Sequence, residues 1–304
     1  MPSSHYEHAA LLVRTAGTPP ERLHAAAVDL REAFVRNEHS IGLLPGDAPD
    51  LLVRTFRAAG DQGHTPALLD LALLYQRGGI APWAPFPGRD VAAAVELYRA
   101  ADDLGSFEGA LGWIRAAYFD RDAELAAAAA ARLGELHTSS PENAEVLLYL
   151  GYFLHQGYGF AADAEAAASF FEAAALRGEA AAAFELSILT ANGDGVPADD
   201  EAAQRWTFRA AELGSDRAQS NLGGMYATGR GVPKDAALAV EWYRRAGDSG
   251  NARAAFIAGV MLLTGEEGLD IDIEGAGEQF DWADELGFPD VDDTLAGMGL
   301  QRPQ

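Results

Sequence analysis

The chain has 304 residues, of which 49% are hydrophobic and 22% are charged. This apolar fraction is high enough to bury a core, which excludes a disordered acidic chain. With 46 Asp and Glu against 22 Lys and Arg, the formal charge is −24. A protein that wraps nucleic acid or lies on an anionic membrane needs clustered basic residues, so the charge argues against both.

Cysteine is absent, which excludes disulfides, thiolate nucleophiles, Cys-ligated zinc and iron–sulfur clusters. The N-terminus has neither the basic start nor the apolar run of a signal peptide, and no apolar stretch reaches the roughly 18 residues of a membrane span. We therefore expect a cytoplasmic protein, with neither a membrane nor nucleic acid among its partners.

The first part of the chain is predicted to be helical but irregular. Residues 6–16, 20–38 and 48–60 have helical patterns, and 56–64 resembles 243–251 further along the chain. We therefore predict that residues 1–64 form an N-terminal helical cap that includes a degenerate repeat, because the terminal units of a repeat array have only one neighbour.

An enlarged turn follows, at residues 77–90, between predicted helices at 67–79 and 91–105. It contains three prolines and two aromatic residues. Proline limits the entropy lost on binding and aromatic rings offer large contact areas, so Trp83 and Phe86 are candidate partner-binding residues. The alternative, which explains the two rings equally well, is that they fold back over the adjacent helices.

From residue 107 onward the chain reads as helical hairpins, at first a degenerate one at 107–136. Four later segments begin 36 residues apart, and an amphipathic stretch that ends in glycine follows each. Apolar residues recur at three- and four-residue steps, which predicts helices, and glycine and proline between them predict a tight turn. The four segments are 150–160, 186–196, 222–232 and 258–269.

One copy of this unit, at 218–250, contains Ala218, Leu222, Gly223, Tyr226, Gly229, Gly231, Val232, Asp235, Trp242, Tyr243, Ala246 and Gly250. These residues resemble the Sel-one-like repeat (SLR) family, relatives of tetratricopeptide repeats. The copy at 182–214 departs from the pattern at Ser187 and Thr190, where the family has Gly and Tyr. The resemblance covers 65–290 and implies an all-α, right-handed α-solenoid of helix-turn-helix repeats, with 291–304 left as a partial helix and tail.

In tetratricopeptide proteins the first helix of each pair usually faces a concave groove. Positions two before or two after the central leucine often line that groove, and a row of apolar side chains there suits a bound peptide or helix. Packing between neighbouring repeats is the alternative explanation of the same residues, which the sequence leaves open. The candidate groove residues are Leu69, Leu73, Trp113, Tyr152, Phe184, Ile188, Phe256 and Val260.

Negative charge is concentrated near the C-terminus. Between Ala254 and Gln301 there are twelve Asp and Glu and no Lys, Arg or His. A basic partner surface, or a solvated cap that prevents end-to-end stacking, would each explain this. The acidic residues from Asp270 to Asp281 follow the spacing of an EF-hand calcium loop, but a helix is expected from about Asp272 and the last ligand is a short Asp. An acidic helix start is the better explanation.

No catalytic set can be identified. The seven histidines are scattered, and the Gly-x-Gly pairs lie in turns between helices instead of after a strand. We therefore predict a non-enzymatic bacterial adaptor or regulatory scaffold that binds a protein or peptide partner in the concave groove, with no metal and no cofactor. The alternative is an acidic decoy, inhibitor or immunity-type protein that occupies a basic surface. The oligomeric state is left open.

Overall fold

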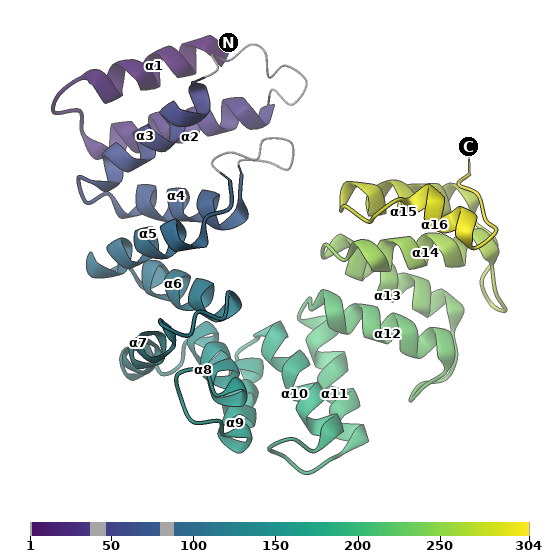
Figure 1. The fold of residues 1–304 in the computed structure, drawn as a ribbon. Helices are drawn as coiled ribbons and strands as arrows, with labels where there is room; N and C mark the ends of the chain where they lie inside the picture. The colour runs from purple at the N-terminus through teal and green to yellow at the C-terminus, as the bar shows by residue number, and fades with distance from the viewer. Residues whose placement is uncertain (1, 37–46, 80–87, 304) are drawn as a thin grey trace. The chain divides into compact units, whose positions relative to one another are not determined.

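The computed structural model describes residues 2–36, 47–79 and 88–303, and in these it contains sixteen helices and one isolated bridge, between Glu266 and Leu269 (Figure 1). The predicted all-α solenoid class is confirmed. Trp83 and Phe86 lie outside the described residues. The helices are α1 (Pro2–Arg14), α2 (Pro20–Arg36), α3 (Ala48–Gly60), α4 (Thr65–Arg77), α5 (Val91–Asp103), α6 (Phe107–Phe119), α7 (Ala126–Ser139), α8 (Ala144–Gln156), α9 (Ala164–Leu176), α10 (Ala180–Asn192), α11 (Asp200–Glu212), α12 (Asp216–Thr228), α13 (Ala236–Asp248), α14 (Ala252–Thr264), α15 (Ile273–Glu285) and α16 (Val291–Gly297).

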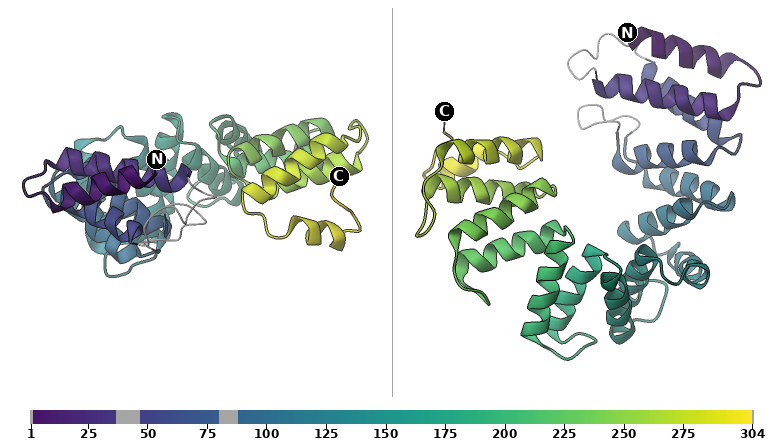
Figure 2. Two further views of the ribbon diagram at one scale, coloured as in Figure 1. Left: turned by 90° about the horizontal axis from the view of Figure 1, so that it is seen from above. Right: turned by 180° about the vertical axis from the view of Figure 1, so that it is seen from behind.

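The chain divides into two compact units. Unit 1 comprises Met1–Leu136 with Tyr158–Phe160, and unit 2 comprises His137–Gly157 with Ala161–Gln304. In unit 2, helices α8 to α15 form four hairpins that stack in chain order, and α16 packs on α15 (Figures 1 and 2). In unit 1, α1 to α3 pack together and α4 to α6 follow as a layered stack. Among the described residues, no helix is both long and apolar enough to cross a membrane.

Most helices of the hairpins begin at a residue whose side chain caps them. Five second helices, α5, α9, α11, α13 and α15, start after an Asp whose carboxylate accepts a hydrogen bond from the backbone N–H three residues later, at 2.8–3.0 Å. Such a cap stabilises a helix by about 1 kcal/mol, because it satisfies a backbone donor that the helix itself cannot pair. These caps are Asp90, Asp163, Asp199, Asp235 and Asp272.

The first helices of the hairpins are capped by Ser or Asn, except for α4 after His64 and α10 after Glu179. Ser106, Asn143, Ser215 and Asn251 each accept from the N–H three residues later, whereas Glu179, which precedes α10, makes no such bond. Four first helices end at a glycine in the left-handed region, with φ between 67° and 80°, a conformation that glycine adopts without strain.

A glycine packed against an aromatic ring holds the two helices of most unit 2 hairpins together. The ring carbons are so near that a Cβ on the glycine would lie 2.6–2.8 Å from them. The rings are at most 8% exposed, and burial raises the pKa of the Tyr243 hydroxyl. The pairs are Gly151 with Phe171, Gly223 with Tyr243, and Gly259 with Phe280.

The hairpin α10–α11 lacks this pair. In the 36-residue register its positions hold Ser187 and Thr207, so both the glycine and the ring are absent. A tightly packed interior depends on such matched shapes, and the loss of a ring leaves space unless neighbouring groups move in.

Candidate functional site

The first helices of unit 2 each leave one row of side chains unburied. The row follows the spacing i, i+4, i+7 and i+11, which places its members on one face of each helix; on α8 the i+4 residue, Tyr149, is buried and does not belong to the row. Because the four hairpins repeat, the rows lie in equivalent positions along the stack. We call this surface the first-helix face; it consists of Glu145, Tyr152, Gln156, Ala181, Glu185, Ile188, Asn192, Arg217, Asn221, Gly224, Thr228, Arg253, Ile257, Val260 and Thr264.

The structure separates the eight predicted groove residues into two groups. Tyr152, Ile188 and Val260 are half-buried members of the first-helix face, and Leu69 and Leu73 are half-buried on α4 of unit 1. The other three, Trp113, Phe184 and Phe256, are only 3–6% exposed.

Each of the three buried rings already has a partner within its own unit. The guanidinium carbon of Arg217 lies 4.4 Å from the centre of the Phe184 ring, and Phe256 stacks on Phe288 with centroids 4.4 Å apart. The indole N–H of Trp113 donates to Asp102 at 2.9 Å. These contacts are those of a packed interior, whereas the half-buried residues have surface left for a partner.

An ion pair on the first-helix face joins two helices. Arg217 on α12 and Glu185 on α10 form an ion pair at 3.2 Å, and the hydroxyl of Tyr152 on α8 lies 3.4 Å from the same carboxylate oxygen. The Glu185 side chain is only 20% exposed, while Arg217 is 60% exposed. The sequence alone did not identify this pair, because its members lie 32 residues apart, in two different repeats.

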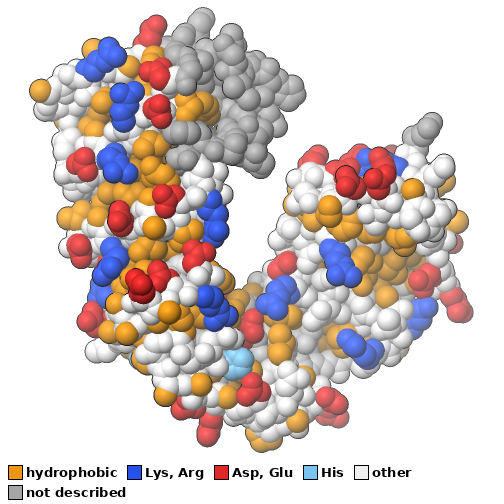
Figure 3. Space-filling model, in the orientation of Figure 1, with side chains coloured by type: hydrophobic (Ala, Val, Ile, Leu, Met, Phe, Trp, Pro, Cys, Tyr) orange, Lys and Arg blue, Asp and Glu red, His pale blue; other side chains and the backbone are white. Residues whose placement is uncertain are grey.

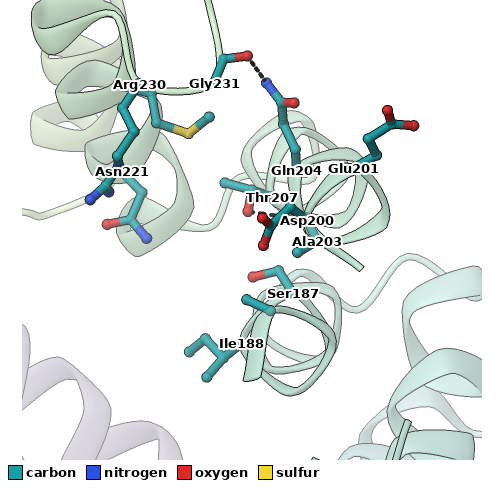
Figure 4. A pocket seen from close by; sticks show the side chains of 12 residues that line it. Ser187, Ile188, Asp200, Glu201, Ala203, Gln204, Thr207, Asn221, Arg230 and Gly231 are labelled. Carbon is teal, nitrogen blue, oxygen red and sulfur yellow. Dashed lines mark hydrogen bonds between the residues drawn. The ribbon is translucent and has the colours of Figure 1, made fainter. Parts of the chain in front are cut away.

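A cavity of about 540 Å³ opens on the first-helix face between α10, α11 and α12 (Figure 4). Its walls come from two first helices, its floor from α11, and one end from the turn between α12 and α13. Ile188 and Asn221 belong both to the cavity and to the face. The lining residues are Ser187, Ile188, Ala191, Asp200, Glu201, Ala203, Gln204, Thr207, Asn221, Met225, Arg230 and Gly231.

The missing glycine–ring pair explains the position of the cavity, since both Ser187 and Thr207 line it. The Ser187 hydroxyl donates to the Phe184 carbonyl at 2.6 Å, and the Thr207 hydroxyl donates to the Ala203 carbonyl at 3.0 Å. Both hydroxyls are therefore satisfied within their own helices, and the floor that Thr207 forms with Ala203 is largely apolar.

Gln204 contributes to the cavity by lying between α11 and the α12–α13 turn. Its side-chain amide donates to the Gly231 carbonyl at 2.8 Å, which is the dashed line in Figure 4. The preceding turn packs much more tightly, because a Cβ on Gly195 would collide with the Ala164 carbonyl. At Gly231 the nearest atoms would be 3.4 and 3.6 Å away, on Met225 and Gln204. The positions equivalent to Gln204 in α9 and α13 are the smaller Ala168 and Val240.

Basic residues from outside the acidic segment 254–301 partly neutralise it. Arg302 lies against the carboxylates of Asp281, Asp284 and Asp292, and Lys234 pairs with Glu266 at 3.0 Å. Figure 3 shows basic and acidic side chains together over this end of unit 2. The spacing that resembles a calcium loop runs into α15, as the helix register predicted. Within the described ranges, no three His, Asp or Glu side chains are placed to hold a metal ion.

Comparison with known proteins points to one family. The model of the Sel1 repeat matches residues 65–106, 144–179, 180–215 and 216–251, which contain the hairpins α4–α5, α8–α9, α10–α11 and α12–α13. None of the curated protein sequences matches the chain.

Three solved structures illustrate the likeness. A Sel1 repeat protein from Oxalobacter formigenes is 23% identical with a TM-score of 0.60, over 98% of this chain and 86% of its own. A protective antigen of uropathogenic Escherichia coli strains, which displays an SLR fold, is 22% identical with a TM-score of 0.49; the match covers 91% of this chain but only 59% of the antigen. An immunity protein from Pseudomonas aeruginosa is 22% identical with a TM-score of 0.40, over 87% and 86%. The Oxalobacter structure supports the fold. At these sequence identities, none of the three structures assigns an activity to this chain.

Proposed function

Because the chain belongs to the Sel1-like repeat family, whose members are generally protein-interaction scaffolds, we propose that it is a non-enzymatic adaptor that binds a segment of a partner protein. The segment lies along the first-helix face of unit 2. The observation that carries the proposal is the row of unburied side chains, which recurs in register on the first helices of four successive hairpins and has a cavity between α10 and α12.

The chemistry of the face suits a polypeptide. Tyr152, Ile188 and Val260 offer apolar surface, and Glu185 and Arg217 lie beside them as an ion pair. Interfaces commonly combine an apolar centre with polar groups that fix the orientation of the bound chain. Repeated hairpins also present equivalent positions at regular intervals, which an extended or helical segment can contact in turn.

A selection of random peptides against the immobilised chain tests this proposal. We expect Ile188→Glu combined with Val260→Glu to weaken the binding of the selected peptides by tenfold or more, that is by at least about 1.4 kcal/mol. The reason is that each change buries a carboxylate under the ligand. The matched control is Leu176→Glu combined with Leu238→Glu, on second helices, where the side chains are 67% and 36% exposed. Equal affinity for both variants, with both folded by circular dichroism, contradicts the assignment of the face.

A second candidate function rests on the acidic segment. Twelve carboxylates between Ala254 and Gln301 favour a decoy, inhibitor or immunity-type protein that occupies a basic surface. Charge-driven binding of this kind weakens steeply with salt, because the screening length falls to about 8 Å at physiological ionic strength. The dissociation constant of an oligo-arginine peptide, measured at low and at physiological salt, tests it; a constant affinity argues against this function.

A further inference from the structure

We infer that the cavity on the first-helix face is a pocket for one aromatic side chain of the bound segment. The inference rests on the proposed function, and it adds the chemical identity of the residue that the partner must present. Phenylalanine and tyrosine are the side chains that this pocket would take.

The repeat register indicates which kind of side chain is missing from the α10–α11 hairpin. At the position of Thr207, the three other hairpins of unit 2 carry Phe171, Tyr243 and Phe280, each packed against the first helix of its own hairpin. In α10–α11 the same space is open to the first-helix face. A ring supplied by a partner would therefore occupy the kind of site that the fold elsewhere fills with its own ring.

The lining of the cavity favours an aromatic ring over an aliphatic group. Ala203, 7% exposed, and the methyl group of Thr207 form an apolar floor. Met225 brings a thioether to the wall, and sulfur–aromatic contacts are favourable by about 0.3–1.5 kcal/mol. Arg230 lies at the rim, where a guanidinium can cover the face of a bound ring.

Polar groups line the opening through which a bound chain would enter. Asn221 is exposed beside the opening, and Gln204 holds the Gly231 carbonyl at 2.8 Å. The cavity volume of about 540 Å³ leaves room beyond one ring for the adjoining backbone, and it lies in the range of sites that hold small ligands. A free small aromatic compound is therefore the natural probe.

The chain contains a suitable set of reporters. Its four methionines are Met1, Met225, Met261 and Met298. Of the three in the described residues, only Met225 lines the cavity, and Met261 is buried on α14, in the following hairpin. In protein labelled with ¹³C at the methionine methyl groups, we expect p-cresol, the side chain of tyrosine, to shift the Met225 signal in a saturable way. The Met261 signal is expected to stay in place.

Two comparisons make the titration decisive. Cyclohexanol, a ring of similar size without aromatic character, is expected to bind at least threefold more weakly than p-cresol. The variant Thr207→Phe with Ser187→Gly restores the glycine–ring pair and is expected to abolish the saturable Met225 shift. Thr207→Leu, which fills part of the cavity with one substitution, is expected to weaken p-cresol binding. It replaces the double variant in this test if the double variant does not fold.

The possible failures are distinguishable. Absence of a saturable Met225 shift in the wild-type protein, or equal binding of cyclohexanol, overturns the aromatic pocket and leaves the peptide-binding face untouched. Selected peptides that lack aromatic residues, or that bind the folded cavity-filling variant as tightly as the wild-type chain, overturn it as well. Loss of the proposed function itself is recognised separately, by peptides that bind Ile188→Glu with Val260→Glu as tightly as its control.

Discussion

The hairpins α10–α11 and α12–α13 share one register but differ in what lies between their helices. In α12–α13, Gly223 admits the ring of Tyr243, and the interior is closed. In α10–α11, Ser187 and Thr207 stand at the same positions, and the interior is open on the first-helix face. The difference shows that one repeat of a solenoid can lack a central ring and keep its helices in place, because hairpins on both sides support it.

The α10–α11 hairpin departs from its neighbours at more than one place. Its first helix is preceded by Glu179, which makes no cap bond, and Gln204 lies where the neighbouring hairpins have small or aliphatic residues. Local rules of packing and capping are most often broken where function requires it. The coincidence of these departures with the cavity supports a binding role for this hairpin in particular.

The largest effect is expected from Tyr243→Thr, which gives α12–α13 the residue of α10–α11. Removal of a buried aromatic ring costs about 3–5 kcal/mol, because packing contacts are lost and a cavity remains. We expect urea unfolding to show a loss of about 3 kcal/mol. Tyr243→Phe, which keeps the ring, should change stability by less than about 1 kcal/mol. A small loss for Tyr243→Thr would mean that the ring is not what closes this hairpin.

A smaller effect is expected when the glycine of the same pair is changed. In Gly223→Ser the new Cβ would lie 2.8 Å from the Tyr243 ring, so the ring or the helix must move. Overpacking of this kind costs about 1–3 kcal/mol. The control is the adjacent Gly224→Ser, where a Cβ would meet only the Tyr243 hydroxyl, at 3.4 Å. Equal stabilities of the two variants in urea would contradict the close packing of Gly223.

The hairpins themselves were predictable from the sequence, because their signals are local. Glycine turns and the apolar period locate each helix; the register predicted a helix from about Asp272, and α15 begins at Ile273. The N-terminal helices were also predicted to within a few residues, since their apolar periods and flanking prolines lie within one segment.

The burial of individual groove residues was not predictable in the same way. Phe184 is covered by Arg217 and Phe256 by Phe288, both from more than 30 residues away along the chain. A helical pattern shows which residues share a face, but not which neighbouring side chain covers them. The cavity was harder still, because it results from a ring that is absent and from the packing of three helices around the gap.

Stabilisation is expected when the cap of α10 is restored. In Glu179→Ser the residue matches Ser215 of the next hairpin, and a new N-cap bond stabilises by about 1 kcal/mol. Burial raises the pKa of Glu179; the N–H of Ala181 acts against this, and the carboxylate of Glu145 adds to it.

That raised pKa sets the sign of the pH dependence of this variant. A carboxyl group with a higher pKa in the folded state favours folding below its unfolded pKa, and the advantage is lost as the pH rises through the folded value. The wild-type chain therefore carries an unfavourable ionised Glu179 at pH 7. We expect Glu179→Ser to raise the unfolding midpoint more at pH 7 than near pH 4. Ser215→Glu is the reciprocal change and should lower it; an equal gain at both pH values would exclude the ionisation effect.

The smallest change in stability is expected from Gln204→Ala, which gives α11 the residue of α9. The amide makes one hydrogen bond, to the exposed Gly231, and such a bond contributes about 1 kcal/mol or less. Alanine has the higher helix propensity, so the net loss should stay near 0.5 kcal/mol. The effect on the cavity should be larger, because without Gln204 the α12–α13 turn can approach α11 as the preceding turn approaches α9. We therefore expect weaker p-cresol binding at Met225 with nearly unchanged urea unfolding. Unchanged p-cresol affinity would show that the missing ring alone keeps the cavity open, and that the Gln204 side chain does not hold the turn away from α11.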